Sequence, residues 1–457
     1  MKKIDRRNFV KGAALASAFM ILPSCATVKT ARANGKVNVA VIGAGGRGSA
    51  SVRALAKNPK AQLVALCDVD DERAAKIFAE FPNVKRYYDF RKMLDEMDKD
   101  IDAVVVATPD HMHFPISAWA MKMGKHVYCE KPLARTVWET RQMAKMAKKY
   151  GVKTQMGNQG HTKDGWRAAK ELVDSGVLGE IEDVYSWTDR PIWPQGNIPL
   201  PAADPIPSSL KYDLWLGVAP KTQYFKKLLP FNWRGLRNFG TGASGDMAVH
   251  VMDAAYSSME LDAPYKIEST QEGMNDFYWP SKSTSHQWFK NPRGKDGVIR
   301  IHWYDGAPGL NKPTEVKRVA HEFLHDPRLM NGTLIVGTKE TVFLDTYGGN
   351  ARLMPLSHHR DMMKAGKLPK KTLPRSKYPD NPWAEWIDAI LAGGDEQSPA
   401  NFGYAAPLTE ISLLNMCAMQ AGKPLEYNAE KMSFTNAPEM NKYLYTLYEY
   451  DKSFLNL

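Results

Sequence analysis

Between residues 36 and 158 the chain alternates short apolar runs with segments of helical periodicity. The apolar runs are KVNVAVIG, AQLVALCDVD, IDAVVVATP and HVYCEKP. Continuous runs of valine, isoleucine and alanine are typical of strands that are buried on both faces of a parallel sheet. The alternation therefore predicts a doubly wound α/β domain over residues 36–158.

The composition changes after residue 158. Stretches rich in proline and tryptophan, such as RPIWPQGNIPLPAADPIPSS, are mixed with alternating segments such as GVIRIHWYDG and GTLIVGTKETVFLDTYG. Alternation of apolar and polar residues indicates strands with one buried face. The chain is also too long for a single hydrophobic core. The sequence therefore predicts a second domain that is built on an antiparallel sheet.

The first 33 residues have the organisation of an export signal. A basic start containing Arg6 and Arg7 precedes an uncharged run over residues 12–22. That run is too short for a membrane span, which needs about 20 apolar residues, and is typical of a signal peptide. The order Arg-Arg-x-Phe-x-Lys resembles the twin-arginine signal of proteins that are exported already folded. We therefore expect a signal peptide over residues 1–33 and a periplasmic or membrane-anchored protein.

Two processing sites compete within this signal. The sequence LPSC resembles a lipoprotein box with Cys25 as the lipidated residue, and ARA at residues 31–33 has the small-x-small form of ordinary cleavage. Both a lipid anchor at Cys25 and cleavage after Ala33 therefore remain open.

Removal of the signal changes the charge balance. Residues 1–33 hold seven basic side chains and one acidic side chain, so their loss lowers the formal net charge from +11 to +5. A basic surface for nucleic acid is therefore not indicated. The remaining cysteines, Cys67, Cys129 and Cys417, lie in apolar or helical patterns, which predicts buried free thiols.

A glycine-rich loop follows the first apolar run. Its G-x-G-x-x-G pattern would bring backbone amides and a helix N-terminus to a pyrophosphate. Asp68 closes the second apolar run 20 residues after Gly48, where a carboxylate accepts hydrogen bonds from a ribose diol and repels a 2′-phosphate. The pattern therefore predicts NAD, with NADP less favoured. The expected loop contacts are Gly43, Gly45, Gly46, Arg47 and Gly48.

Polar residues follow the next two apolar runs, in ATPDHMH and CEKPLA. Ligands of parallel α/β sheets bind beyond the carboxyl ends of the strands. A lysine there is costly to desolvate unless its charge is used, whereas a lysine that points to water would have no such role. The expected cofactor contacts from these segments are Thr108, Pro109, His113, Glu130 and Lys131.

The segment GTGASGDMAVHVMDAAY predicts a helix that carries a second cluster. Asp246 and His250 are four residues apart and Asp253 follows three residues later, so all three share one helical face. A carboxylate one turn from an imidazole can orient it and raise its basicity, as a general base requires. The alternative is that Asp246 caps the helix and His250 is half buried in the core.

These motifs together resemble the Gfo/Idh/MocA family of glucose-fructose oxidoreductase and inositol 2-dehydrogenase. The resemblance extends from AVIGAGGRG through ATPDHMH, CEKPLA and GDMAVHVMD to PLTEISLLNMCAMQAGKPLEY. It implies an N-terminal Rossmann domain and a C-terminal α+β domain, over residues 159–380, with a large open, mostly antiparallel sheet that often mediates homo-oligomers. The helices of residues 381–457 would return to the first domain.

The resemblance also implies hydride transfer between a nicotinamide and a sugar or cyclitol carbon. Lys131 matches the family's lysine that binds the reacting hydroxyl, Asp246 matches the acid that contacts substrate, and His250 matches the proton acceptor. Elementary chemistry agrees, because an alcohol loses its hydroxyl proton on oxidation and a positive charge stabilises the developing oxyanion.

Several polar and aromatic residues of the second region are candidates for carbohydrate contact, although tryptophans could equally pack the sheet. These candidates are Asn158, Gln159, His161, Arg190, Trp193, Trp233 and Arg234. We expect no metal site.

A nucleotide site outside the cytoplasm requires a cofactor that is loaded before export and stays bound. Tightly bound NAD must then be regenerated in place, either by coupled oxidation and reduction of two substrates or by a closed cycle. The closed cycle resembles that of NAD-dependent glycosidases, in which a transient ketone permits elimination of a glycoside. The lysine of CEKPLA favours the dehydrogenase. A noncatalytic sugar-binding lipoprotein is the third alternative.

Overall fold

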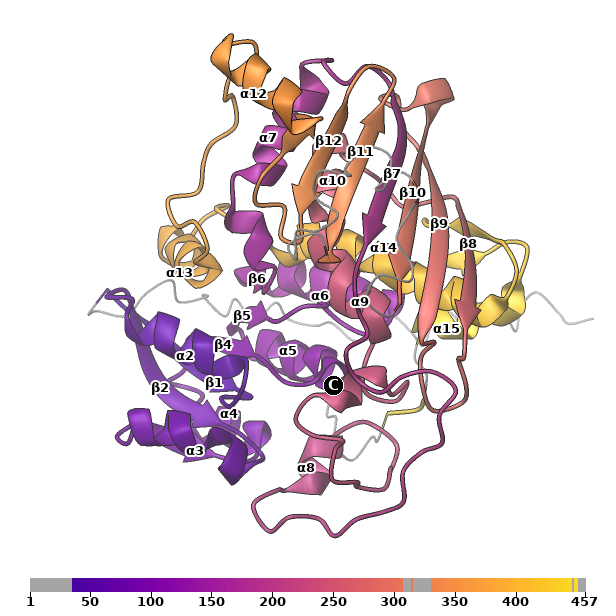
Figure 1. Cartoon of the computed structure of the whole chain (residues 1–457). Helices are drawn as coiled ribbons and strands as arrows, with labels where there is room; N and C mark the ends of the chain where they lie inside the picture. Colours follow the sequence, from indigo (N-terminus) through magenta and orange to yellow (C-terminus); the bar gives the residue numbers. More distant parts are fainter. Residues whose placement is uncertain (1–34, 307–313, 315–329, 446–447, 451–457) are drawn as a thin grey trace, which may run out of the picture.

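Two β-sheets and the helices that cover them make up the structure, a computed structural model that describes residues 35–306, 314, 330–445 and 448–450 (Figure 1). The expected signal peptide, with Cys25, lies outside the described residues. No helix among the described ranges is long and apolar enough to cross a bilayer.

The first sheet has six strands in the order β3-β2-β1-β4-β5-β6. Every neighbouring pair in it is parallel. The strands are β1 (Val37–Ile42), β2 (Ala61–Cys67), β3 (Lys85–Tyr87), β4 (Ala103–Val106), β5 (His126–Cys129) and β6 (Thr154–Met156). This order confirms the predicted Rossmann-type sheet, whose apolar runs are buried because both faces are covered.

Helices cover both faces of this sheet. They are α2 (Gly48–Ala56), α3 (Asp71–Glu80), α4 (Phe90–Glu96), α5 (His113–Lys122) and α6 (Val137–Tyr150). Leu55 and Ile77, from α2 and α3, belong to one apolar cluster, whereas Phe114 and Met143, from α5 and α6, belong to another. The sheet is therefore a layer between two separate cores. Cys67, Cys129 and Cys417 are buried free thiols, as predicted.

The second sheet has nine strands in the order β13-β12-β11-β7-β10-β9-β8-β14-β15. Its pairs are antiparallel except for β7 with β10. The strands are β7 (Ile181–Trp187), β8 (Lys266–Glu272), β9 (Lys282–Lys290), β10 (Val298–Asp305), β11 (Gly332–Gly337), β12 (Thr341–Asp345), β13 (Arg352–Met354), β14 (Leu425–Asn428) and β15 (Ser433–Phe434). This confirms the predicted large, mostly antiparallel sheet.

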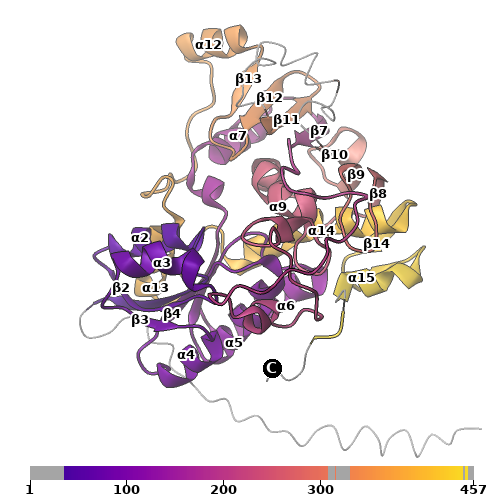
Figure 2. The same ribbon diagram turned by 60° about the horizontal axis from the view of Figure 1, so that its bottom comes forward.

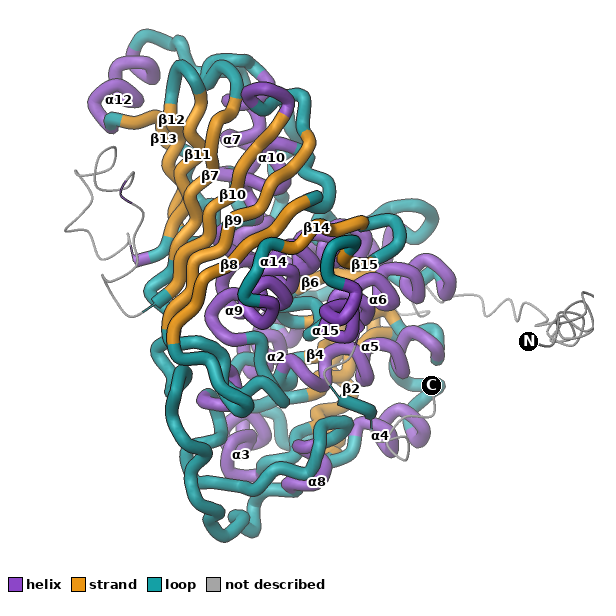
Figure 3. Tube along the Cα trace, turned by 90° about the vertical axis from the view of Figure 1, so that its right-hand side faces the viewer, coloured by secondary structure: helices purple, strands orange, loops and turns teal. Residues whose placement is uncertain are grey.

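Helices α7 (Gly165–Asp174), α9 (Gly242–Val251) and α10 (Asp253–Met259) pack on one side of this sheet (Figure 3). Buried side chains alternate with half-buried or exposed side chains along β9 and β10, which reflects this one-sided packing. The remaining short elements are α12 (Leu356–Lys364), α15 (Lys442–Tyr445), η1 (Asp110–Met112), η2 (Gln159–Thr162), η4 (Lys295–Gly297) and η7 (Pro438–Asn441).

The C-terminal segment connects the two domains. Helix α13 (Pro382–Ala392) packs on the α2 side of the first sheet through Trp386 and Ile387. Helix α14 (Phe402–Ala421) places Phe402 in a core of the first domain and Ile411 in the core of the second. After these helices the segment also contributes β14, which pairs with β8 of the second sheet.

Residues 188–240, between β7 and α9, form what we call the cover segment. It contains α8 (Tyr212–Leu216) and η3 (Asn232–Gly235) and has an apolar cluster of its own (Figures 1 and 2). Its backbone joins the loop after β2, because Lys211 N–H donates to the Val69 carbonyl at 2.8 Å and Asp71 N–H donates to the Ser209 carbonyl at 3.1 Å. The cover segment therefore lies across the carboxyl ends of the first sheet.

Candidate active site

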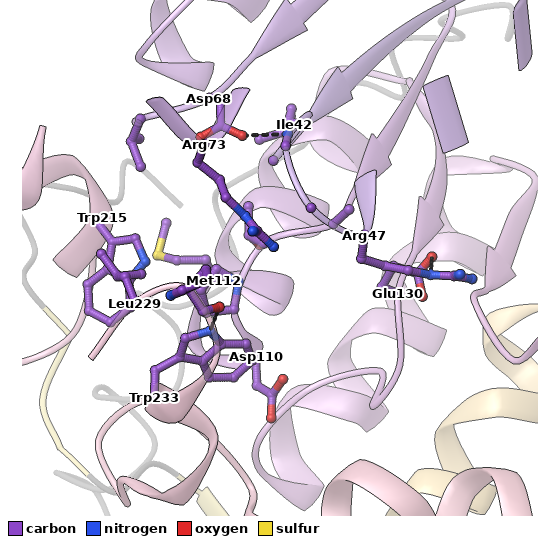
Figure 4. Close-up of a pocket in the computed structure, with 18 of the residues that line it drawn as sticks. Ile42, Arg47, Asp68, Arg73, Asp110, Met112, Glu130, Trp215, Leu229 and Trp233 are labelled. Carbon is purple, nitrogen blue, oxygen red and sulfur yellow. Dashed lines mark hydrogen bonds and ion pairs between the residues drawn. The ribbon is translucent and has the colours of Figure 1, made fainter. Parts of the chain in front are cut away.

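A cavity of about 500 Å³ lies at the carboxyl ends of the first sheet. Its walls come from the strand-end loops, the cover segment and α9. Figure 4 shows Asp68 and Arg73 in one part of this cavity, Arg47 beside Glu130 in another, and Trp215, Leu229 and Trp233 opposite them. Residues of the glycine loop line the same cavity as Lys131, Asp246 and His250.

The glycine loop packs so tightly against the rest of the chain that two of its glycines leave no room for a side chain. Gly43 has φ +79°, and an added Cβ would lie 2.6 Å from the Ala107 carbonyl oxygen. A Cβ on Gly48 would lie 1.9 Å from the Gly43 carbonyl oxygen, so this glycine serves the packing of α2 rather than the cavity wall. Gly43, Gly45, Gly46 and Arg47 line the cavity. The loop therefore fits a dinucleotide pyrophosphate at the start of α2.

Asp68 closes one end of this loop. Gly45 N–H donates to Asp68 Oδ2 at 2.7 Å, and Asp70 N–H donates to Oδ1 at 3.0 Å. Burial raises the Asp68 pKa to about 6, against the opposing effect of these backbone hydrogen bonds. The guanidinium of Arg73 crosses the loop close to Gly46. A carboxylate in this position fits a ribose diol.

The ends of β4 and β5 form the next part of the wall. Thr108, Pro109 and Glu130 line the cavity. Arg47 Nε lies 3.1 Å from Glu130 Oε1, and its guanidinium packs over the Trp383 ring at 5.6 Å. Glu130 therefore holds the glycine loop to the end of β5 through an ion pair.

His113 lies behind this wall and does not line the cavity, contrary to its expected role as a cofactor contact. Its Nδ1 lies 2.7 Å from the Pro132 carbonyl oxygen and its Nε2 lies 2.9 Å from the Thr108 carbonyl oxygen. Burial lowers its pKa, but Cys129, Asp110 and the Pro132 carbonyl outweigh burial and raise it to about 10. His113 thus supports the loops after β4 and β5 from within the core.

Lys131 and Asp246 form a half-buried pair at the other end of the cavity. Lys131 Nζ donates to Asp246 Oδ1 at 2.7 Å and to the Asp246 backbone carbonyl at 2.6 Å. Arg234 Nε lies 3.3 Å from the same carboxylate oxygen. Burial raises the Asp246 pKa, but Lys131 and Arg234 outweigh it and hold the pKa well below its usual range. Asp246 is therefore an ionised carboxylate that contacts the positively charged side chains of Lys131 and Arg234.

His250 lies one helical turn further along α9 and lines the same cavity. Its Nδ1 lies 2.8 Å from Asn158 Oδ1. Burial lowers the His250 pKa well below its usual value, Lys131 and Arg47 lower it further, and Asp246 raises it. The imidazole is therefore neutral at physiological pH, as a proton acceptor must be.

The contact that orients His250 differs from the sequence expectation. Asp246 is one turn away, but its hydrogen bonds go to Lys131 and Arg234, and Asn158 supplies the contact to the imidazole. Helical spacing predicts only that Asp246 and His250 share one face of α9. It does not predict which groups contact the Asp246 carboxylate, and Lys131 and Arg234 do so instead of the imidazole.

The seven residues proposed for substrate contact divide into two groups. Gln159, Arg190, Trp233 and Arg234 line the cavity. Asn158, His161 and Trp193 do not. His161 Nδ1 lies 2.9 Å from Asp253 Oδ2 in the core, and Trp193 Nε1 donates to Gln195 Oε1 at 2.8 Å within the cover segment. One ring face of Trp233 is taken by the Arg234 guanidinium, 4.3 Å from the ring centroid.

Sequence reasoning missed several residues of the cavity wall. Tyr347, in the loop after β12, packs edge-on against His250 with 5.1 Å between ring centroids. Asp110 accepts hydrogen bonds from the Thr241 amide at 3.1 Å and from the Thr241 hydroxyl at 2.7 Å. No local pattern marks Tyr347, but Asp110 lies within the ATPDHMH motif. The described residues contain no group of three or more histidine, cysteine, aspartate or glutamate side chains that could hold a metal.

A glycine cradle with a buried acceptor for ribose, joined to a lysine, a carboxylate and a neutral histidine, is an arrangement typical of nicotinamide-dependent oxidoreductases. The chain belongs to the Gfo/Idh/MocA oxidoreductase family. Residues 37–158 match the family's NAD-binding Rossmann fold, and residues 163–274 match its C-terminal alpha/beta domain. The N-terminal domain is therefore an NAD-binding Rossmann domain.

Proteins of similar sequence include sugar dehydrogenases. A levoglucosan dehydrogenase of Pseudarthrobacter phenanthrenivorans is 29% identical over 244 residues, which cover 51% of this chain and 54% of that protein. A glycosyl hydrolase family 109 protein of Shewanella amazonensis is 33% identical over 162 residues, covering 30% of this chain and 36% of that protein. The chain thus spans about half, or less, of the length of these relatives.

Solved structures share the fold over most of the chain. The aldose-aldose oxidoreductase from Caulobacter crescentus complexed with glycerol superposes with a TM-score of 0.58 at 18% identity, covering 86% of this chain and 100% of that one. A levoglucosan dehydrogenase complex with NADH and L-sorbose gives 0.56 at 19% identity, covering 86% and 99%.

Proposed function

We propose that the chain is an exported enzyme that transfers a hydride between tightly bound NAD and a hydroxyl-bearing carbon of a sugar or cyclitol. One observation carries the proposal: the dinucleotide cradle and the Lys131, Asp246 and His250 cluster line one cavity. Structural neighbours were solved with polyhydroxylated ligands, L-sorbose and glycerol, which supports a small polyhydroxylated compound as substrate. Bound NAD supplies the acceptor for the hydrogen that leaves the carbon with its electron pair.

The residues of this chain move the proton. His250 accepts the hydroxyl proton, because it is neutral and faces the cavity. Lys131 Nζ stabilises the negative charge that develops on the substrate oxygen, and Asp246 fixes Lys131 through two hydrogen bonds. Asp246 Oδ1 accepts hydrogen bonds from both Lys131 and Arg234, so the carboxylate also holds these two side chains in place beside the substrate.

Retention of the cofactor is the second part of the proposal. Leu210, Leu214 and Trp215 of the cover segment line the cavity from the side opposite the glycine loop. The cover segment is hydrogen-bonded to residues 69–71, and we propose that these contacts slow the release of the nucleotide. Retention of this kind is what a nucleotide enzyme exported by the twin-arginine route needs, and we propose such export to the periplasm, with or without a lipid on Cys25. We further propose that the protein is a homo-oligomer.

A second candidate function is favoured by the similarity to glycosyl hydrolase family 109 proteins. In that case the same oxidation would be followed by loss of the glycoside, hydration and re-reduction, with no net redox change. The retained Lys131 and the levoglucosan dehydrogenase relative favour the oxidoreductase. A noncatalytic sugar-binding lipoprotein is the least favoured alternative, because it would leave Lys131 and His250 without a purpose.

One experiment separates these functions. The purified protein is mixed with D-glucose, D-xylose, myo-inositol or an aryl glycoside, and reduced cofactor and released aglycone are measured. The oxidoreductase gives at most one equivalent of reduced cofactor, and turnover resumes when a carbonyl substrate is added. Repeated cleavage of the aryl glycoside, with solvent deuterium beside the transient ketone, would instead establish the glycosidase. Neither reaction, in protein free of nucleotide, would establish the noncatalytic binder.

A further inference from the structure

The amide of Asn158 has a fixed orientation. This residue lies between β6 and η2 and is completely buried. Its Nδ2 donates to the Val249 carbonyl oxygen at 3.1 Å, and its Oδ1 lies 2.8 Å from His250 Nδ1. A carbonyl oxygen only accepts hydrogen bonds, so the opposite amide orientation would put two oxygens against each other. Val249 therefore determines that Oδ1, an acceptor, faces His250.

This orientation determines which ring nitrogen of His250 carries the proton. An amide oxygen can only accept, so Nδ1 must be the protonated nitrogen of the neutral imidazole. The remaining nitrogen, Nε2, then carries the lone pair. Nε2 has no hydrogen-bond partner within the described ranges of the chain, and His250 lines the cavity.

We propose that Asn158 is a positioning residue that locks His250 in the tautomer with the proton on Nδ1, so that Nε2 is the atom that accepts the substrate's hydroxyl proton. The assignment deepens the proposed function and rests on it for the role of Nε2. The sequence predicts that Asn158 contacts the carbohydrate, whereas in this assignment it acts through His250 instead.

The surroundings hold Asn158 in place from both sides. His161, three residues later in η2, pairs with Asp253 at the start of α10, three residues after His250. Gly157, immediately before Asn158, has no room for a side chain, since an added Cβ would lie 2.5 Å from Glu130 Oε2. The amide of Asn158 is thus held on one side by the pairing of His161 with Asp253 and on the other by the packing of Gly157 against Glu130.

The tautomer can be measured without turnover. Nitrogen chemical shifts of a ¹⁵N-histidine-labelled holoprotein distinguish a protonated Nδ1 from a protonated Nε2, and a His250→Gln sample assigns the signal. We expect a neutral ring with the proton on Nδ1 in the native protein. A proton on Nε2 would overturn the proposal whatever the catalytic results.

Two substitutions test the role of the amide oxygen. Asn158→Leu removes the amide oxygen that accepts from His250 Nδ1. We therefore expect signals from both tautomers and a kcat at least about tenfold lower, with KM for the probe sugar changed much less. The probe is whichever of D-glucose, D-xylose and myo-inositol reduces the bound cofactor fastest. In Asn158→Asp the acceptor is kept and a negative charge is added, so the tautomer should persist and the acid limb of the kcat/KM profile should move to higher pH.

Asn291→Leu is the matched control. Asn291 is also buried and its Nδ2 donates to the Met259 carbonyl at 2.9 Å, but it lies outside the cavity lining. This variant loses a similar hydrogen bond and should keep the native tautomer, kcat and pH profile.

The outcomes separate the proposal from the function on which it rests. An Asn158→Leu protein with the native tautomer and the native pH profile would overturn the proposal. If this variant does not fold, the Asn158→Asp profile and the native spectrum decide, and an unshifted acid limb counts against the proposal. If no probe sugar reduces the cofactor in the native protein but Nδ1 is protonated, the proposed function fails while the tautomer assignment stands.

Discussion

Lys131 Nζ contacts Asp246 twice, at 2.7 Å through Oδ1 and at 2.6 Å through the backbone carbonyl oxygen. The two residues come from different domains, the end of β5 and the middle of α9, so this pair joins the Rossmann sheet to the helix that carries His250. The charge of Lys131 is therefore fixed beside the proton acceptor before any substrate arrives, which is the arrangement that electrostatic stabilisation of an oxyanion requires.

Replacement of Lys131 tests this pair. Lys131→Met should lower the rate at which a sugar reduces the bound cofactor by about a hundredfold or more, the usual effect of losing one positioned stabiliser. The nucleotide content should stay unchanged. Lys125→Met is the matched control, because Lys125 is also a mostly buried lysine with a carboxylate partner, Asp98 at 2.7 Å, outside the cavity. Equal rates in Lys131→Met and the native protein would exclude Lys131 from the chemistry.

Binding of NAD to the nucleotide-free protein should depend on pH through Asp68. Burial raises the pKa of this carboxyl to about 6. The ionised form is the better acceptor for a ribose diol, so binding releases a proton when the pH is below this value, and affinity should fall as the pH is lowered through it. Titration calorimetry at pH values on both sides of the pKa measures the effect. In Asp68→Asn, which cannot ionise, the dependence in this range should vanish. If it persists, another group is responsible.

The tether of the cover segment should control cofactor release. Lys211 N–H donates to the Val69 carbonyl, and the backbone of Lys211 has φ −84°, which is close to the value that proline requires. Lys211→Pro should therefore remove one hydrogen bond with little strain and speed the loss of NAD during gel filtration or dilution. Lys211→Ala keeps the N–H and is the control. Equal NAD retention in both variants would show that the tether does not limit release.

The parts of the structure that sequence predicts are those with a local signal. Continuous apolar runs predicted β1, β2, β4 and β5 of the parallel sheet, whereas β3, with the sequence KRY, carries no such run. The glycine pattern and Asp68 follow two of the predicted strands, at strand ends that the topology of a parallel sheet brings together. The segments GVIRIHWYDG and GTLIVGTKETVFLDTYG, which form β10 and the pair β11 and β12, predicted the second sheet in the same way.

The remaining features depend on contacts between distant residues. Asn158 and His250 are 92 positions apart, and their spacing in the sequence carries no information about a shared hydrogen bond. The same holds for the pairing of His161 with Asp253 and for Tyr347 at the cavity. The cover segment was expected only as proline-rich loops, because its path across the first sheet depends on backbone hydrogen bonds to residues 69–71.

The central claim is that this chain carries its own NAD. The most direct measurement is the mass spectrum and quantity of nucleotide released by denaturing protein that was purified without added cofactor. We expect close to one NAD per folded chain, because the glycine cradle, Asp68 and the cover segment together line the site. NADP in its place would contradict the assignment of Asp68, and the absence of any nucleotide would contradict the claim of a retained cofactor.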